Sequence, residues 1–233
     1  MKETPSIGLG TIDAVPLHEL VYRRLNHALM AGRIRPGQKL TSRKLAQELG
    51  TSDMPVRAAL QKLQALKALE PLPNGSLVLP AMTRDRFADL TASRLICEPA
   101  ATEAAVARIG KADLRSLRKS CAALTDAARS QDVDEYLLRN HEYKFLIYRA
   151  SGSESLLFLI ETLWLQVGPF LRQLGTSFAA GFGEILKIDF HEEVAEALER
   201  GDGRAAAEAI RMDISKGAEQ LLQSDVFAPP PAR

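Results

Sequence analysis

Apolar residues recur at helical spacing along most of the chain. Every third or fourth position is apolar over residues 17–31, 42–49 and 52–67, a spacing that predicts three short helices. Gly32 and Gly50 end the first two of them, as glycines commonly do just past a helix. The N-terminal part of the chain therefore begins with three helices joined by short turns.

Two short apolar runs follow the third helix, at residues 69–72 and 77–79. Pro-Asn-Gly-Ser separates them, which is typical of the turn in a β-hairpin. Helix, helix, tight turn, helix and hairpin is the order of a winged helix-turn-helix, whose third helix enters the major groove of DNA. We predict this fold for residues 16–80, preceded by a disordered arm at residues 1–15.

Only helical periodicity is present from Thr83 to Ser224, with glycine- or serine-containing breaks near residues 110, 130, 152, 180 and 202. This pattern predicts about six helices in an all-α bundle. The predicted fold class is thus mainly α, with the winged helix-turn-helix followed by a helical-bundle domain over residues 81–226. The proline-rich residues 227–233 are expected to form a disordered tail.

The net charge of +1 at first argues against a nucleic-acid partner. Its distribution reverses that argument, because residues 1–80 hold 11 basic and 6 acidic side chains, whereas residues 81–233 hold 19 and 23. On the third helix, Arg57, Gln61 and Gln64 lie opposite the apolar Val56, Leu60 and Leu63. Because Arg pairs with guanine and Gln with adenine, this face is suited to the major groove.

Several other classes lack support in the sequence. No run of 18 apolar residues and no signal peptide is present, which favours a cytoplasmic protein without a membrane span. The isolated Cys97 and Cys121 fit a reducing compartment. Phosphate-binding and nucleophile motifs are missing, and a His191–Asp213 pair without a nucleophile is a weak basis for an enzyme.

The runs LMAGRIRPGQKL, at residues 29–40, and LAQELGTSDMPVRAAL, at residues 45–60, resemble the GntR family of bacterial transcription regulators. The resemblance implies DNA contacts by Arg43, Ser52, Asp53, Met54, Arg57 and Gly75, to which the helix spacing adds Gln61. Many members have Arg where this chain has Asp53. An acid there repels phosphate but can accept a hydrogen bond from cytosine.

The second part resembles the FCD effector domain of the FadR-type branch. The matching residues are Arg94 and Glu98, Tyr143 and Lys144, Tyr148 to Gly152, His191, Ala197 and Leu198, Gly201 and Asp202, and Asp213 and Ile214. In many FCD domains an Asp or Asn and three His bind a metal ion, and the matching positions here are Asn140, Lys144, His191 and Asp213. An ammonium group has no lone pair for a metal. We therefore predict no metal cofactor, with a weak site at Asn140, His191 and Asp213 as the alternative.

Five polar residues lie on the apolar stripes of the predicted bundle: Arg94, Asn140, Lys144, His191 and Asp213. Because unpaired burial of polar groups is unfavourable, they are expected to line a polar pocket. Lys144 and Asp213 would form an ion pair there, and Tyr148 would supply an apolar wall. Trp164 is expected to belong to the hydrophobic core. Three basic groups favour a small carboxylate as the effector.

The sequence thus predicts a DNA-binding repressor whose operator affinity is set by a small anionic metabolite. The resemblance implies a homodimer, and a dimer implies a palindromic double-stranded operator. The alternatives are a metal-dependent FCD regulator and an architectural DNA-binding protein without an effector. Polar residues on buried stripes argue against the architectural alternative.

Overall fold

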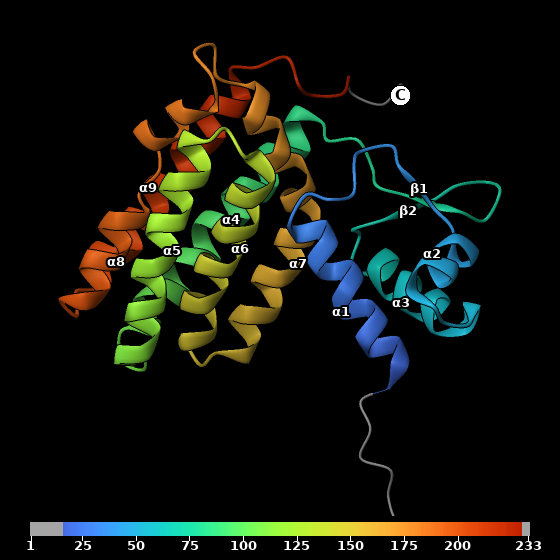
Figure 1. Cartoon of the computed structure of the whole chain (residues 1–233), viewed down its shortest axis with the longest axis horizontal. Helices are drawn as coiled ribbons and strands as arrows, with labels where there is room; N and C mark the ends of the chain where they lie inside the picture. The colour runs from blue at the N-terminus through green and yellow to red at the C-terminus, as the bar shows by residue number, and fades with distance from the viewer. Residues whose placement is uncertain (1–15, 230–233) are drawn as a thin grey trace, which may run out of the picture.

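The computed structural model describes residues 16–229, and its first part is a small helical unit closed by a sheet (Figure 1). Its elements are α1 (Leu17–Met30), β1 (Lys39–Leu40), α2 (Ser42–Leu49), α3 (Asp53–Ala65), β2 (Glu70–Pro71) and β3 (Leu77–Val78). Within the described residues the strands pair antiparallel in the order β1–β3–β2. This is the predicted winged helix-turn-helix. The predicted arm at residues 1–15 lies outside the described residues.

The second part is a bundle of long helices, as predicted. Its elements are α4 (Arg84–Ala105), α5 (Lys111–Arg129), α6 (Val133–Ala150), α7 (Glu154–Leu171), the 3₁₀ helices η1 (Arg172–Thr176) and η2 (Phe182–Lys187), α8 (His191–Glu199) and α9 (Gly203–Leu222). Side-chain caps start several of them: Thr83, Ser153 and Asp202 each accept a hydrogen bond from a backbone N–H three residues later. Such caps satisfy amide groups that the first helical turn leaves free.

The last described residues pack against the bundle. The Phe227 ring lies 5.4 Å from that of Phe87 and 5.0 Å from that of Phe170, measured between ring centroids. The backbone N–H of Ala228 donates to Met82 O at 2.9 Å. The prolines of this segment predict a disordered tail, whereas the aromatic ring that precedes them packs on the bundle. Residues 230–233 lie outside the described residues.

Helix α7 is the most apolar helix of the bundle and lies between α4 and α1. Together with the following turn, Glu154–Thr176 is long and apolar enough to cross a membrane by length and composition alone. Its Ile160, Trp164 and Leu165 are buried in the protein, whereas Phe158 and Leu159 are exposed. In this fold α7 therefore serves as a core helix with one apolar side left uncovered.

The two parts meet where the end of α1 crosses α7. A Cβ atom added to Gly168 of α7 would lie 2.9 Å from Met30 O, in the last turn of α1. This is shorter than the contacts that a Cβ atom makes with a backbone oxygen. Arg86 of α4 strengthens the junction, since it donates to Glu70 on β2, to Lys67 O and to Gln166 of α7. The winged helix-turn-helix is thus packed directly on the bundle.

We expect Gly168→Ala to destabilise the protein by about 1–3 kcal/mol, the range for an overpacked site whose neighbours cannot move away. Urea denaturation measures this difference in the free energy of unfolding. Gly217→Ala in α9 is the matched control, because a Cβ atom there meets nothing within 4 Å, and it should be neutral or slightly stabilising. Equal effects of the two substitutions would contradict the close crossing.

Candidate DNA-contacting surface and polar pocket

The exposed face of α3 carries the residues predicted to contact DNA. Met54 is 80% exposed, and Arg57 and Gln61 are exposed one and two turns further on. The opposite face buries the three predicted apolar residues, which are Val56, Leu60 and Leu63. The expected separation of the helix into a buried and an exposed face is therefore present.

The other predicted contacts surround α3. Arg43 is exposed in the first turn of α2, and Ser52 is exposed at the N-cap of α3, where its side chain makes no capping bond. Gly75 lies at the tip of the wing with a φ of 78°, which a residue with a side chain adopts only under strain. Arg43 and Ser52 are thus exposed as the prediction requires, and Gly75 has a turn conformation.

Asp53 is paired within the protein. Its Oδ2 atom accepts a hydrogen bond of 2.6 Å from Arg57 Nη2, one turn further along α3. A contact with Ser42 at the start of α2, and this ion pair, hold the pKa of Asp53 below its usual value. The cytosine contact considered from the sequence therefore competes with Arg57 for the same carboxylate.

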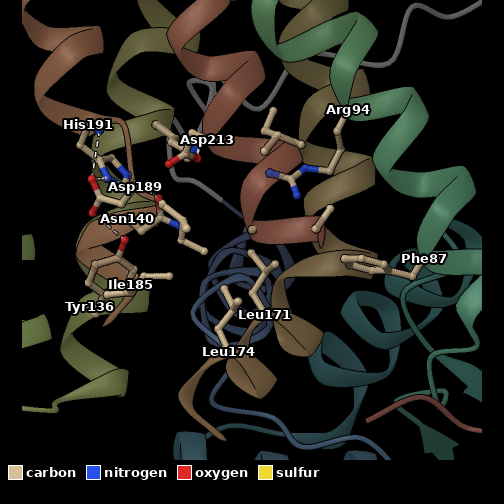
Figure 2. Close-up of a pocket in the computed structure, with 15 residues that line it drawn as sticks. Phe87, Arg94, Tyr136, Asn140, Leu171, Leu174, Ile185, Asp189, His191 and Asp213 are labelled. Atoms are coloured by element: carbon tan, nitrogen blue, oxygen red, sulfur yellow. Dashed lines mark hydrogen bonds and ion pairs between the residues drawn. The ribbon is translucent and has the colours of Figure 1, made fainter. Parts of the chain in front are cut away.

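A polar cavity lies inside the helical bundle and brings together five of the six residues predicted for the effector site (Figure 2). They are Arg94 of α4, Asn140 and Lys144 of α6, His191 of α8 and Asp213 of α9. Apolar side chains, among them Phe87, Leu171 and Ile185, complete the wall. The space open to the centres of water-sized molecules is about 50 Å³, which is room for a few waters.

Two buried ion pairs hold the cationic groups of this cavity. Lys144 Nζ lies 2.5 Å from Asp213 Oδ2, as predicted, and Lys144 is only 1% exposed. Arg94 Nε lies 2.5 Å from Oε1 of the fully buried Glu98. Burial of charges is tolerated when each is paired and hydrogen-bonded, so both basic side chains are fixed in place.

Tyr148 does not line the cavity. It is fully buried, and its hydroxyl donates to Glu98 Oε2. Trp164 Nε1 donates to the other oxygen of the same carboxylate at 3.0 Å. The structure thus separates Tyr148 from the other predicted effector residues. Its sequence position, one turn after Lys144 on α6, does not distinguish a wall of the cavity from a support behind it.

His191 contacts a residue that the sequence analysis missed. Its Nε2 atom lies 2.9 Å from Asn140 Oδ1, and its Nδ1 atom lies 3.0 Å from Asp189 Oδ1. The hydroxyl of Tyr136, which was also missed, donates to Asp189 Oδ2 at 2.9 Å. Tyr136 precedes Asn140 by one helical turn, a signal that was available, whereas Asp189 lies in a loop without periodicity.

These charges shift one another's pKa values. Burial disfavours the charged imidazolium, but the carboxylates of Asp189 and Asp213 outweigh that effect and raise the pKa of His191. Burial likewise opposes ionisation of Asp189, yet His191 lowers its pKa to about 2. Lys144 and His191 hold the pKa of Asp213 below its usual value in spite of burial. His191 and Asp189 therefore form an ion pair when the imidazole is protonated.

We expect His191→Gln to destabilise the protein more at about pH 5 than at about pH 8. Because the folded-state pKa of His191 is raised above 6.5, its stabilisation is complete below pH 6.5 and is lost as the pH rises through that folded value. Asp189, lowered from 3.8 to about 2, stabilises above pH 3.8 and loses this effect as the pH falls through 2. The titratable groups that face His191 are those of Asp189, Asp213, Lys144, Tyr136 and Tyr143.

Urea denaturation of the wild type and of His191→Gln at both pH values measures the difference. His18→Gln, at an exposed position on α1, is the control and should show no such dependence. A cost of His191→Gln that is the same at both pH values would contradict the ion pair.

The residues at the FCD metal positions do not fit a metal ion. The ammonium group of Lys144 lies against Asp213 at 2.5 Å and supplies positive charge where a cation would bind. Among the described residues, no group of three or more His, Cys, Asp or Glu side chains is placed to hold a metal. The charges at this cavity are therefore those of basic side chains and the carboxylates that pair with them.

Comparisons with known proteins agree with both halves of the fold. Residues 17–78 match the model of bacterial regulatory proteins of the gntR family, and residues 89–216 match the FCD domain. The HTH-type transcriptional regulator McbR of Escherichia coli (strain K12) is 30% identical over 167 residues, which cover 72% of this chain and 76% of that protein.

Solved structures show the same architecture. E. coli McbR/YncC has a TM-score of 0.83 at 26% identity and covers 90% of this chain and 99% of that chain. A GntR transcriptional regulator from Rhodococcus sp. RHA1 shares the fold, with a TM-score of 0.68 at 19% identity over 89% of this chain and 98% of that chain. With the FCD match alone spanning more than half of its residues, the chain belongs to the GntR family of transcription regulators, with an FCD effector-binding domain, and is not an enzyme.

Proposed function

We propose that this regulator is a repressor that binds a palindromic DNA operator as a homodimer and responds to a small anionic metabolite in the polar cavity. The observation that carries the effector proposal is that Arg94 and Lys144 line this cavity and are held there by ion pairs with Glu98 and Asp213. Both cations are held in place, and each retains N–H groups beyond those its carboxylate partner accepts.

A carboxylate fits these remaining donors. Arg94 uses Nε and Nη2 toward Glu98, and a guanidinium group has five N–H donors. Lys144 uses one of three N–H donors toward Asp213. Charge-assisted hydrogen bonds to a carboxylate are stronger than hydrogen bonds between neutral groups. The small cavity restricts the ligand to a compact acid, unless the surrounding helices move apart to admit a larger one.

For the operator, we propose that Arg57 contacts a base edge and that Asp53 positions it. The carboxylate of Asp53 accepts a hydrogen bond from Arg57 Nη2. The other N–H donors of the guanidinium group remain free for the two acceptor atoms of a guanine. We propose that Arg43, Ser52, Met54, Gln61 and Gly75 contribute the other contacts with DNA. Asp53 then acts through Arg57 and makes no base contact of its own.

Support for the dimer comes from an uncovered apolar surface on α4 and α7. Ile96 is 73% exposed and Phe158 is 58% exposed, and Ala92, Ala100 and Leu159 are exposed on the same two helices. Helices α4 and α7 pack against each other. Large exposed apolar side chains gathered on neighbouring helices are typical of a protein interface, and a second copy of this chain is the partner that a palindromic operator requires.

A thermal-shift screen against small metabolite acids, with and without a metal chelator, tests the effector proposal. A ligand that binds the folded state raises the melting temperature. We expect an acid that raises it equally with chelator present, and no response in Lys144→Met. The control Lys119→Met, at an exposed position on α5, should respond like the wild type. A shift lost on chelation, or no shift with any acid, would contradict the proposal.

A further inference from the structure

A second cluster of candidate ligands lies where α1 meets the bundle, away from the polar cavity. His27 and Met30 lie three residues apart on α1, a spacing that places both on one face of the helix. His141 of α6 approaches them: its Nε2 atom lies 3.1 Å from Met30 Sδ, and its ring centroid lies 5.7 Å from that of His27. The DNA-contacting surface and the effector proposal use none of the three.

His141 is poorly satisfied for a buried polar side chain. It is 6% exposed, and its Nδ1 atom has no hydrogen-bond partner among the described residues. The other ring nitrogen faces a thioether, which is a weak acceptor. Neither ring nitrogen therefore has a strong hydrogen-bond partner among the described residues.

We propose that His27, Met30 and His141 form a binding site for a soft monovalent metal ion, Cu(I). Imidazole nitrogen and thioether sulfur are ligands that suit Cu(I). Zinc sites use thiolate, imidazole and carboxylate ligands, and this trio contains neither a thiolate nor a carboxylate. Binding joins a nitrogen lone pair of each of the two imidazole rings and a sulfur lone pair to the ion, so it needs no oxidant or reductant.

The surroundings give the ion a route in. A groove that opens to solvent is lined by all three residues, together with Tyr22 and Asn26 of α1. Because His141 comes from α6 and the other two ligands from α1, a bound ion would tie the DNA-binding unit to the bundle.

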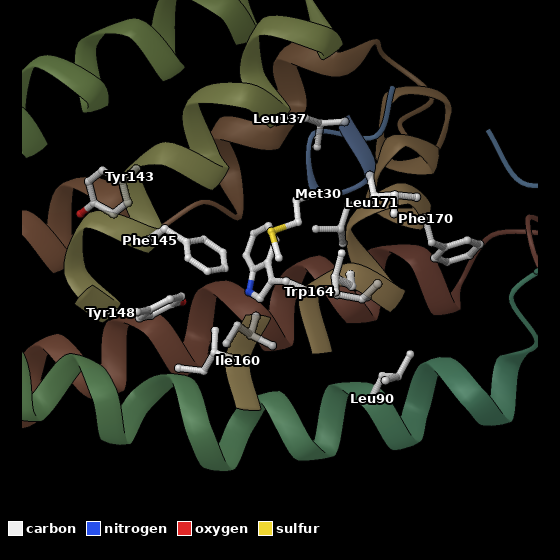
Figure 3. Close-up of a cluster of buried hydrophobic side chains, with 14 of the residues drawn as sticks. Met30, Leu90, Leu137, Tyr143, Phe145, Tyr148, Ile160, Trp164, Phe170 and Leu171 are labelled. Carbon is white, nitrogen blue, oxygen red and sulfur yellow. The ribbon is translucent and has the colours of Figure 1, made fainter. Parts of the chain in front are cut away.

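Trp164 provides a built-in reporter, because it is the single tryptophan of the chain. Its ring lies 5.8 Å from that of His141, and Figure 3 shows it with Met30 in one buried cluster. A heavy, soft ion at this distance is expected to quench its fluorescence. The signal therefore reports occupancy of this cluster and not of a distant surface site.

The test is an anaerobic titration of the full-length protein with Cu(I), and with Ag(I) as a redox-inert substitute, against a competing chromogenic chelator. Cys97→Ser is the background, because that thiol is partly exposed. We expect one ion per chain, with quenching of Trp164. Met30→Leu, which preserves volume, and His141→Gln should each weaken binding at least about tenfold, because loss of even an outer-shell partner of a metal ligand weakens binding by about 10- to 100-fold.

His18→Gln on the same helix is the matched control and should bind like the background protein. Circular dichroism of the ion-free variants shows whether each has folded. If His141→Gln does not fold, Met30→Leu still tests the proposed site. Unchanged affinity in Met30→Leu, binding no tighter than that of the competing chelator, or a preference for Zn(II) over Cu(I) would each overturn the proposal.

Discussion

Replacing Arg57 by Ala is expected to weaken binding to the selected operator by about 1–3 kcal/mol, or roughly 5- to 150-fold, the range for loss of one bidentate contact to guanine. Arg57 is exposed on α3 and is oriented by Asp53 at 2.6 Å. Binding to unrelated DNA should fall much less, because the other basic residues of the N-terminal part still contact phosphates. The sequence preference is therefore what Arg57→Ala removes.

Fluorescence anisotropy with an operator selected from a random duplex library, and with a scrambled duplex, measures both affinities. Asp53→Ala should lose part of the same preference, since Arg57 then has no partner on its helix. Arg115→Ala, an exposed position on α5, is the matched control and should bind like the wild type. An equal loss on operator and scrambled DNA would show that Arg57 contacts only the backbone.

Replacing Lys144 by Met is expected to destabilise the protein by about 3–5 kcal/mol, because it leaves the Asp213 carboxylate without its partner. Lys144 is buried, and Asp213 Oδ2 lies 2.5 Å from its ammonium group. Removing both charges has a different result, since an apolar pair often replaces a buried ion pair without loss of stability. The double variant Lys144→Met, Asp213→Leu should therefore regain most of the lost stability.

Urea denaturation measures the stability of the single and double variants, and the thermal-shift assay measures their response to the acid. The double variant should fold and yet give no response to the acid that stabilises the wild type. A double variant that is stable and still responds would show that the ion pair serves the fold and not the effector. A stable Lys144→Met single variant would contradict the buried pair itself.

The sequence predicts the fold well wherever the pattern is local. The helix at residues 42–49 appears as α2 with the same bounds, because Thr41 and Gly50 mark its ends. The strand β1 was missed because it has two residues and its pairing with β3 joins Lys39 to Val78, a contact that no local period reveals. The packing of Phe227 on Phe87 is of the same long-range kind.

The residues of the cavity are likewise predictable from the sequence only where they lie on a helical stripe. Arg94, Asn140, Lys144, His191 and Asp213 lie on helical stripes, and the structure brings all five together. Asp189 lies outside any helix, so no stripe indicates it. The pairing of Asp53 with Arg57 has the four-residue spacing of a helical ion pair. The spacing alone does not distinguish an Asp53 that pairs with Arg57 from one that contacts a base.

The affinity of the wild type for its selected operator, measured with and without a saturating concentration of the stabilising acid, tests the central claim most directly. Effector coupling of about 1–3 kcal/mol corresponds to a change of roughly 5- to 150-fold. We predict a change in this range for the wild type and none for Lys144→Met, Asp213→Leu. An acid that binds the wild type and leaves its operator affinity unchanged would contradict the account.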